Sequence, residues 1–392
     1  PYVALAVRLI KMGHSAVICT GESFRKLVED NGVAFHRVTS DLMALLNTEE
    51  GRQVLVSGVR HPFRAMRYAR EVVNPAFRKS LDDFWAGAQG AEVILYHPKA
   101  LAAPDMAKAL KIPCISVPPV PITYPVSEFP NMAIAPTANW GAALNRLSYS
   151  MMGKADLSSL KEINDFRRKT LGLPARKAGV YAYEIDGRLI PIICPVSPAL
   201  FEDVKSWDGR VYLPGFMYLD VEHLALDPQV AAFLANGDRP IVVSFGSMPL
   251  RRPQAFLSML SAALKMTGNR AVLLTSEMDL SVDGDDNILA VKSAPHGLLF
   301  PCAKGIVHHG GIGTAAEALR SGAPQLILPF SGDQPFWAHR LHRLGYALHP
   351  LQEGALSSAK LADAFREMGC PEHIRSAAQI RERLAREDGC GS

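Results

Sequence analysis

The chain has 392 residues, two to three times the usual length of one domain, so its length predicts two domains. Hydrophobic residues make up 48% of the chain and charged residues 20%, a composition that supports sizeable cores and excludes a disordered protein. The 42 Lys and Arg residues outnumber the 38 Asp and Glu residues only slightly and are dispersed, so no nucleic-acid partner is predicted.

The six cysteines lie far apart and form no C-x-x-C pair, so neither a disulfide framework nor a zinc site is predicted. This pattern is typical of a reducing compartment, and we expect a cytoplasmic protein. The most apolar stretches are short and contain several prolines, which argues against a membrane-spanning helix. The chain begins at Pro1, without methionine and inside an apolar helical pattern, so we expect that a preceding segment is absent.

The first half of the chain is predicted to alternate strands with helices. In chain order the pattern predicts a helix to Met12, a strand over 16–20, a helix over 23–31, a strand over 92–96, a helix over 104–110 and a strand over 114–117. Residues 118–136 are rich in proline and aromatic residues and predict an ordered loop, which a helical region over 140–171 follows. This alternation indicates stacked parallel βα units.

A second series of the same kind follows a polar, proline-containing stretch at 220–229, which we interpret as a linker. It comprises a helix over 228–235, a strand over 241–245, a helix over 254–267, strands over 271–275, 288–291 and 305–308, a helix over 314–320 and a strand over 325–329. The tail over 374–387 predicts a charged amphipathic helix. The fold class is therefore α/β, with an N-terminal domain over 1–218 and a C-terminal domain over 219–392.

The most informative segment is the glycine-rich turn between the strand over 305–308 and the following helix. Gly310, Gly311 and Gly313 free the backbone there, and N–H groups at a helix N-terminus favour a phosphate or diphosphate. His309 adds a side-chain donor at the same place. The alternative is a tight strand-to-helix turn that binds no ligand, because glycine is used wherever φ is positive.

Two further turns follow apolar strands. The turn 244–247 has the sequence Ser-Phe-Gly-Ser, and ligands of open α/β sheets gather outside the carboxyl ends of the strands, so this turn and the glycine-rich turn are expected to share one crevice. In the turn 329–338, Asp333 and Gln334 supply the carboxylate and amide that recognise sugar hydroxyls. The competing interpretation is that Asp333 is a helix N-cap before Pro335.

A dinucleotide-binding site is a rival interpretation. Residues 311–316 match the pattern G-x-G-x-x-A between a strand and a helix, and Asp333 follows about twenty residues later. The match comes late in the chain, two histidines precede the turn, and Asp333 follows a Ser-Gly turn instead of ending a strand. An NAD-dependent oxidoreductase therefore stays an alternative to a phosphate site of another kind.

Taken together, these segments resemble the donor site of the UDP-glycosyltransferase family, in the branch of sterol 3-beta-glucosyltransferase-like and bacterial natural-product enzymes. The motifs that carry the resemblance extend through nearly the whole chain: MGH at 12–14, IP at 112–113, VSPAL at 196–200, LPGF at 213–216, SFGS at 244–247, APH at 294–296, HHGGIGT at 308–314 and GDQPFWA at 332–338.

The resemblance implies a GT-B fold, in which two Rossmann-like domains face each other across a cleft and the final helix packs back on the N-terminal domain. The C-terminal domain would bind the nucleotide-sugar donor and the N-terminal domain the acceptor. The family's enzymes invert the anomeric configuration and need no metal and no cofactor. The co-substrate is a UDP-sugar or TDP-sugar, and glucose is the expected sugar.

The resemblance also implies a role for each matching residue. It places Ser247, His309, Gly310, Gly311, Gly313 and Thr314 at the donor diphosphate, Glu317 at the ribose, Pro295 and His296 at the base, and Asp333 and Gln334 at the donor sugar.

Two departures from the family pattern matter. Where plant relatives stack a tryptophan on uracil, this chain has about Ser293, so the choice between uracil and thymine nucleotides stays open. Members of the branch also carry their general base in a turn just before the segment that matches Pro1 and Tyr2. The catalytic residue is therefore unknown within this sequence and expected upstream of Pro1.

Apolar residues at 118–129 and 140–152 fit an acceptor pocket for a sterol, polyketide, flavonoid or lipid hydroxyl, and they fit ordinary packing equally well. An acceptor of this kind partitions into lipid, so a weak contact with a membrane surface is a further expectation. Two more alternatives stay open, a non-catalytic nucleotide-sugar-binding auxiliary protein and a GT-B sugar-nucleotide epimerase.

Overall fold

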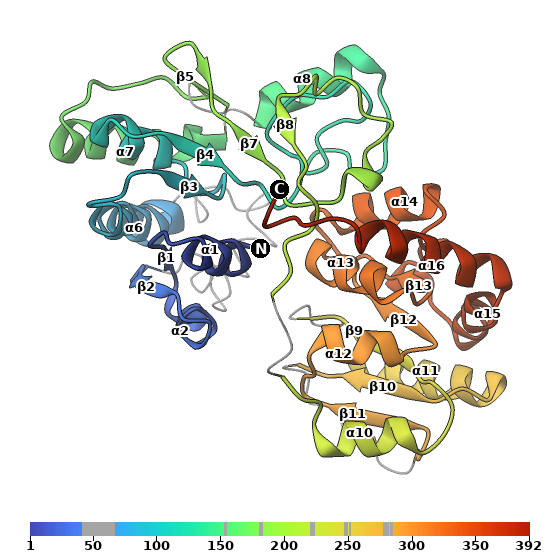
Figure 1. Cartoon of the computed structure of the whole chain (residues 1–392). Coiled ribbons are helices and arrows are strands. Elements are labelled where there is room, and N and C mark those ends of the chain that lie inside the picture. The colour runs from blue at the N-terminus through green and yellow to red at the C-terminus, as the bar shows by residue number, and fades with distance from the viewer. Residues whose placement is uncertain are drawn as a thin grey trace.

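The computed structural model describes residues 1–40, 67–152, 155–179, 183–219, 224–246, 250, 252–276, 282 and 285–392. Its two halves lie side by side, with the N-terminal half in blue to green and the C-terminal half in yellow to red (Figure 1). Both ends of the chain lie near the middle, between the two halves. None of the helices in the described ranges is long and apolar enough to cross a membrane.

The N-terminal half contains two parallel sheets and one short antiparallel hairpin. β1 pairs with β2, the larger sheet has the order β3-β4-β7-β8, and β5 pairs with β6 in the hairpin. The elements are α1 (Tyr2–Lys11), β1 (Val17–Thr20), η1 (Glu22–Phe24), α2 (Arg25–Asp30), β2 (Ala34–Arg37), η2 (Ala69–Val73), α6 (Asn74–Gly87), β3 (Ile94–Tyr96), α7 (Ala103–Leu110), β4 (Cys114–Ser116), α8 (Ala142–Met152), η3 (Ala155–Ser159), α9 (Leu160–Phe166), η4 (Arg167–Leu171), β5 (Glu184–Ile185), β6 (Arg188–Leu189), β7 (Ile192–Ile193), η5 (Pro198–Leu200) and β8 (Val211–Tyr212).

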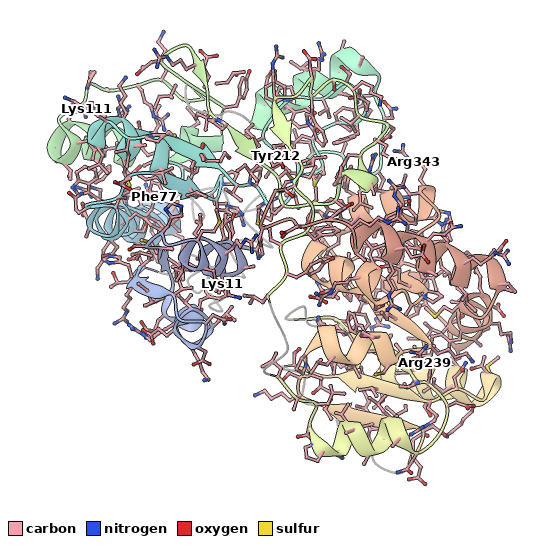
Figure 2. The ribbon with its side chains drawn as sticks, viewed as in Figure 1. Lys11, Phe77, Lys111, Tyr212, Arg239 and Arg343 are labelled. Carbon is pink, nitrogen blue, oxygen red and sulfur yellow. The ribbon has the colours of Figure 1, made fainter. Side chains whose placement is uncertain are left out.

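The predicted strands and helices of this half are present, although β2, η2, α6 and the short strands β5 to β8 were not predicted. Residues 118–136 form turns and bends without a helix or strand, as expected. Phe129 and Met132 of this loop are buried in a core cluster, as is Tyr149 of α8. These three residues therefore serve ordinary packing, whereas Pro119 of the same loop lines the cavity described below, so the acceptor-pocket interpretation of these segments stays a prediction. Figure 2 shows the side chains, including the buried Phe77 of α6.

The C-terminal half contains one sheet of five parallel strands in the order β11-β10-β9-β12-β13. Residues 220–223 of the predicted linker lie outside the described residues. The elements are α10 (Pro228–Ala235), β9 (Ile241–Ser244), α11 (Pro253–Thr267), β10 (Ala271–Leu274), β11 (Ile288–Val291), α12 (His296–Leu299), η6 (Phe300–Cys302), β12 (Gly305–His308), α13 (Ile312–Ser321), β13 (Gln325–Ile327), α14 (Gln334–Arg343), η7 (Glu353–Ala355), α15 (Ser358–Met368) and α16 (Pro371–Leu384).

Two separate cores cover the two faces of this sheet. Val243 packs with α11 and α15 on one face, and the neighbouring Val242 packs with α10, α12 and α13 residues on the other. Successive side chains of a strand point to opposite faces, so a strand covered on both sides must be apolar throughout. All four residues of β9, β10 and β12 are accordingly buried.

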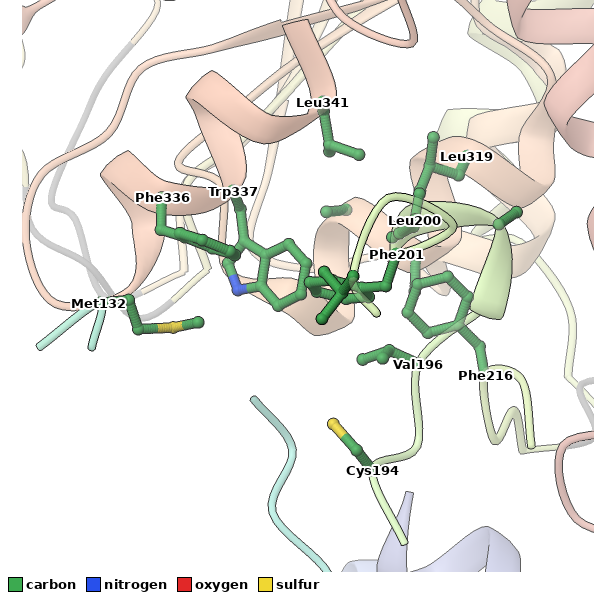
Figure 3. Close-up of a cluster of buried hydrophobic side chains, with 14 of the residues drawn as sticks. Met132, Cys194, Val196, Leu200, Phe201, Phe216, Leu319, Phe336, Trp337 and Leu341 are labelled. Carbon is green, nitrogen blue, oxygen red and sulfur yellow. The ribbon is translucent and has the colours of Figure 1, made fainter. Parts of the chain in front are cut away.

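A third core joins the two halves of the molecule. Phe201 of the N-terminal half packs with Phe336 and Trp337 of α14 (Figure 3). The same cluster contains Trp207 of the N-terminal half and Ile380 of α16. Polar contacts reinforce the junction beyond α16, where the Ser197 hydroxyl donates to the Glu387 carboxylate over 2.6 Å. The chain is thus an α/β protein of two parallel-sheet domains joined by a shared apolar core.

Candidate functional site

The strand order of the C-terminal sheet brings three turns to one edge. β9 lies between β10 and β12, so the order of the strands reverses where β9 meets β12. Ser244 at the end of β9 pairs with His308 at the end of β12, which in turn pairs with Ile327 of β13. Because ligands of open α/β sheets bind at such a reversal, outside the carboxyl ends of the strands, this edge is the candidate site.

The turn after β12 requires glycine at two positions. Gly310 has φ +87°, and a Cβ there would lie 2.7 Å from Cγ2 of Ile327. A Cβ at Gly311 would lie 2.4 Å from Nε2 of His309. Gly313 differs, because a Cβ there would meet no atom within 4 Å. Gly310 is therefore needed for the turn itself, Gly311 leaves room for the ring of His309, and Gly313 leaves open space at the start of α13.

The helix after this turn presents free N–H groups. Its first internal hydrogen bond runs from Ala315 N to Gly311 O over 2.9 Å, so the N–H groups of Ile312, Gly313 and Thr314 have no acceptor within the helix. Such groups and the helix dipole attract an anion. The sequence missed Ile312, because α13 begins two residues before the predicted Thr314.

The backbone of Gly310 corrects one expectation. Its N–H donates to Nδ1 of His308 over 3.1 Å, so it is not available to a diphosphate in this structure. Since Nδ1 of His308 accepts, Nε2 carries the proton and donates to Gln325 Oε1 over 2.8 Å. The Gln325 amide donates onward to the carbonyl of Tyr346. His308 therefore fixes the glycine turn and does not face a ligand.

Protonation of His308 should make the protein less stable in mild acid. Complete burial lowers the pKa of His308 to about 3, below its ordinary value of 6.5. As pH falls below about 6.5, the unfolded chain binds a proton that the folded chain refuses, so the free energy of unfolding falls by up to about 1.4 kcal/mol per pH unit. His308→Asn keeps an acceptor for Gly310 and cannot be protonated. Urea unfolding between pH 7 and pH 5 should show that the free energy of unfolding falls less steeply with pH in this variant than in the unaltered protein. Equal slopes would mean that His308 does not cause the loss of stability.

His309 has an unsatisfied polar atom at the centre of the site. The residue is 9% exposed, and its Nδ1 is buried with no hydrogen-bond partner among the described residues. Burial lowers the pKa of His309, against the opposing effects of the Ser244 carbonyl and of Asp333. A buried polar atom without a partner destabilises a protein, so we expect Nδ1 to form a hydrogen bond with an oxygen of a bound ligand.

The turn after β9 lies against His309. Gly246 has φ +58°, and a Cβ there would lie 3.3 Å from Cε1 of that histidine. Ser247, predicted at the diphosphate, lies outside the described residues. The Ser244 hydroxyl is 3.2 Å from Nε2 of His296, and burial lowers the pKa of His296 to about 4. The ring of His296 stacks on Phe300 at 4.4 Å between centroids, so this imidazole is held neutral and fixed.

Asp333 and Gln334 lie in the turn after β13. Asp333 occupies the N-cap position of α14, but its side chain accepts no N–H of the first turn. Its Oδ2 accepts instead from the indole N–H of Trp337 over 2.8 Å. Oε1 of Gln334 accepts from the backbone N–H groups of Phe330 and Ser331. The N-cap interpretation is thus right for the position of Asp333 and wrong for its side chain.

A cavity of about 650 Å³ lies between the two halves. Four predicted residues line it from the C-terminal half, namely Pro295, His296, Gly313 and Glu317. His309, Thr314, Asp333 and Gln334 are not among the lining residues. Sequence reasoning missed the opposite wall, formed in part by Leu27, Asp30 and Asn31 at the end of α2, because no local pattern marks these residues.

Glu317 lies in this cavity in a partly buried ion pair. Arg320 donates to its Oε2 over 2.7 Å, and the Arg320 guanidinium lies 4.1 Å from the centroid of the Tyr218 ring. Burial raises the pKa of Glu317, an effect that Arg320 opposes. The carboxylate is therefore held in one orientation at the cavity wall, where it can accept hydroxyl hydrogen bonds.

Alanine at Gly313 should leave the protein folded and weaken UDP binding at least about tenfold. Alanine favours a helix over glycine by up to about 1 kcal/mol, but its Cβ would occupy the open space beside the free N–H groups. Alanine at Gly310 should instead destabilise the fold by about 1–3 kcal/mol, because it meets Ile327 and a positive φ. Calorimetric titration with UDP and thermal unfolding test both variants. Unchanged UDP binding by Gly313→Ala would show that no phosphate approaches there.

The fold and this edge site define a GT-B protein of two Rossmann-like domains, and comparisons with known proteins agree. The family described as erythromycin biosynthesis protein CIII-like, C-terminal domain, matches residues 271–388. Sterol 3-beta-glucosyltransferase UGT80A2 of Arabidopsis thaliana is 30% identical over 99% of this chain and 61% of its own length. O-mycaminosyltylonolide 6-deoxyallosyltransferase of Streptomyces fradiae is 28% identical over 99% of this chain and 91% of its own.

Solved structures show the same fold. The calicheamicin glycosyltransferase CalG4 superposes with a TM-score of 0.67 at 19% identity, covering 100% of this chain and 91% of its own. Glycosyltransferase VinC in complex with DTDP gives a TM-score of 0.63 at 19% identity, covering 98% of this chain and 92% of its own. The chain is thus similar to glycosyltransferases over nearly its whole length, and its C-terminal part matches the family model named above. The chain spans about three fifths of the length of the first plant relative.

Proposed function

We propose that this protein transfers a sugar, with glucose the first candidate, from a UDP-sugar or TDP-sugar to a hydroxyl group of an apolar acceptor. The observation that carries the proposal is the convergence of three turns at the reversal of strand order, beside a cavity that both halves line. The cavity volume of about 650 Å³ lies within the usual range for small-molecule sites.

The donor would lie across the C-terminal sheet edge. The N–H groups of Ile312, Gly313 and Thr314, together with His309 and Ser247, would meet the diphosphate. Glu317 would accept from the ribose, and Pro295 and His296 would contact the base. Asp333 and Gln334 would bind the sugar. The roles of Ser247 and Pro295 stay predictions from the resemblance, and Asp333 and Gln334 lie outside the residues that line the cavity.

The acceptor hydroxyl would attack the anomeric carbon from the face opposite the diphosphate and so invert its configuration. As the carbon–oxygen bond to the diphosphate breaks, negative charge grows on the leaving group. Fixed N–H donors at the start of α13 stabilise that charge without reorganising. The acceptor class rests on the relatives, whose names specify a sterol and a tylonolide derivative. A weak contact with a membrane surface and a cytoplasmic location stay predictions.

The topology argues against the NAD alternative. In a dinucleotide-binding fold the glycine fingerprint follows the first strand of the sheet. Here the matching glycines follow β12, the fourth strand of the C-terminal sheet in chain order, and Asp333 begins α14 with its carboxylate on Trp337. The resemblance to the fingerprint is therefore local.

Ligand binding tests the proposal without knowledge of the acceptor. Calorimetry and thermal unfolding with UDP, TDP, UDP-glucose, TDP-glucose and NAD should show binding of a nucleoside diphosphate or its sugar, since a ligand of the native state raises its stability. Binding of a UDP-sugar or TDP-sugar without NAD supports the donor site. Binding of NAD alone, or of no ligand, overturns it.

A further inference from the structure

We propose that Trp337 is a positioning residue that holds the carboxylate of Asp333 for recognition of the donor sugar. The inference rests on the proposed function, because it assumes that Asp333 contacts that sugar. It starts from a single contact, the 2.8 Å hydrogen bond from the indole N–H of Trp337 to Oδ2 of Asp333.

The contact spans one turn of α14 and replaces the expected cap. Asp333 is the N-cap residue, yet its carboxylate accepts no backbone N–H of the helix. An indole N–H is a donor only, and a buried one needs an acceptor. Among the described residues, no hydrogen bond engages the other carboxylate oxygen, Oδ1. The carboxylate is thus fixed through one oxygen and keeps an oxygen for a hydroxyl group.

Trp337 is itself held in place by packing. Its side chain is fully buried and is one of the largest such side chains in the described residues. The ring meets Phe201 edge-on at 5.8 Å between centroids and Phe336 at 5.3 Å, as the close-up of this core shows (Figure 3). A close-packed side chain cannot change rotamer freely, so its N–H is a fixed donor.

The same packing links the sugar site to the junction between the domains. Phe201 comes from the N-terminal half and stacks nearly parallel to Phe336, with 15° between the ring planes. The ring centroid of Phe129, in the loop over 118–136, lies 5.0 Å from that of Phe336. The orientation of Asp333 therefore depends on the contact between the two domains and not on the turn alone.

Trp337→Phe tests this role, because it removes the N–H and keeps an aromatic ring in the core. The Kd for UDP-glucose or TDP-glucose, whichever the unaltered protein binds, should rise about tenfold or more, the usual effect of losing a charged hydrogen bond. The Kd for the matching nucleoside diphosphate should stay within about twofold, since it lacks the sugar. A mere structural defect would weaken both.

Phe336→Leu is the matched control. It disturbs the same core on the same helix and leaves the indole N–H and Asp333 in place. Its ratio of Kd values for sugar nucleotide and diphosphate should equal that of the unaltered protein. The proposal is overturned if Trp337→Phe keeps that ratio, or if Phe336→Leu changes it as much. If the unaltered protein binds no nucleotide or nucleotide sugar, the proposed function itself fails.

A second measurement needs no variant that removes the tryptophan. The chain has four tryptophans, so a nitrogen-15 spectrum should resolve four indole N–H signals. Asp333→Asn should identify that of Trp337 by shifting it. In the unaltered protein this signal should move with the sugar nucleotide and not with the diphosphate. An equal response to both ligands would overturn the role.

Discussion

Replacement of His309 by alanine should weaken UDP binding about tenfold or more and lower the rate of sugar transfer about 100-fold to 1,000-fold. Nδ1 of this residue is buried without a partner, beside the turn whose N–H groups face the proposed diphosphate. Removing one fixed donor from a developing oxyanion has effects of this size on the rate. A lost charge-assisted hydrogen bond accounts for the effect on binding.

The protein should stay folded, because Nδ1 contributes no hydrogen bond within the described structure, although removal of a ring that is 9% exposed leaves a cavity. The melting temperature of His309→Ala should therefore fall by a few degrees at most, with the unfolding transition still cooperative. His309→Gln restores a side-chain donor and should recover part of the affinity for UDP. Calorimetry with UDP measures the change in affinity, and initial rates at saturating donor measure the change in the rate of sugar transfer. If UDP affinity and turnover stay near those of the unaltered protein, His309 does not contact the diphosphate and the prediction is wrong.

Replacement of Arg340 by alanine should lower the free energy of unfolding by about 3 kcal/mol, the lower end of the range for breaking a buried ion pair. Its side chain is 3% exposed and forms an ion pair with Asp203 of the N-terminal half. It also donates to the carbonyl of Leu200 over 2.7 Å, and its guanidinium lies 4.5 Å from the ring centroid of Phe201. The lower end is expected because Asp203 is 44% exposed and keeps a second partner, Arg343.

Arg343 is the matched control for this prediction. It pairs with the same carboxylate over 2.8 Å, but its side chain is 62% exposed at the end of α14, where Figure 2 labels it. An exposed ion pair contributes at most about 1 kcal/mol, so Arg343→Ala should lower the free energy of unfolding by no more than that amount. Urea unfolding compares the two variants. Equal losses would mean that Arg340 acts through surface charge and not through the buried junction.

The sequence predicted much of the C-terminal half correctly. The bounds of α10, β11 and β12 agree with the predicted ranges 228–235, 288–291 and 305–308. Buried parallel strands are continuous apolar runs between turn residues, so their signal is local. β2, α6 and the strands β5 to β8 of the N-terminal half were missed, and the described strands there are only two to four residues long. Such short strands give too little periodicity to separate them from loops.

Some features of the candidate site could likewise be predicted from the sequence, and others could not. The glycines at 310, 311 and 313 and the pair Asp333 and Gln334 stand out in the sequence, because a turn with positive φ and a polar pair after an apolar strand are local features. The pairing of Ser244 with His308, which brings their turns together, depends on strand order. Strand order follows from packing between distant segments, which no local window contains.

The sequence by itself determined the alternation of strands and helices, the glycine turn and the resemblance to UDP-glycosyltransferases, because each depends on the order of residues along a few short segments. Only the tertiary structure decided which N–H groups of that turn are free, since His308 takes the N–H of Gly310. It also decided that Asp333 is held by Trp337 and that Trp337 packs on Phe201, 136 residues earlier in the chain. Contacts between residues so far apart in the chain form only when the two domains pack together. No local stretch of sequence therefore specifies them.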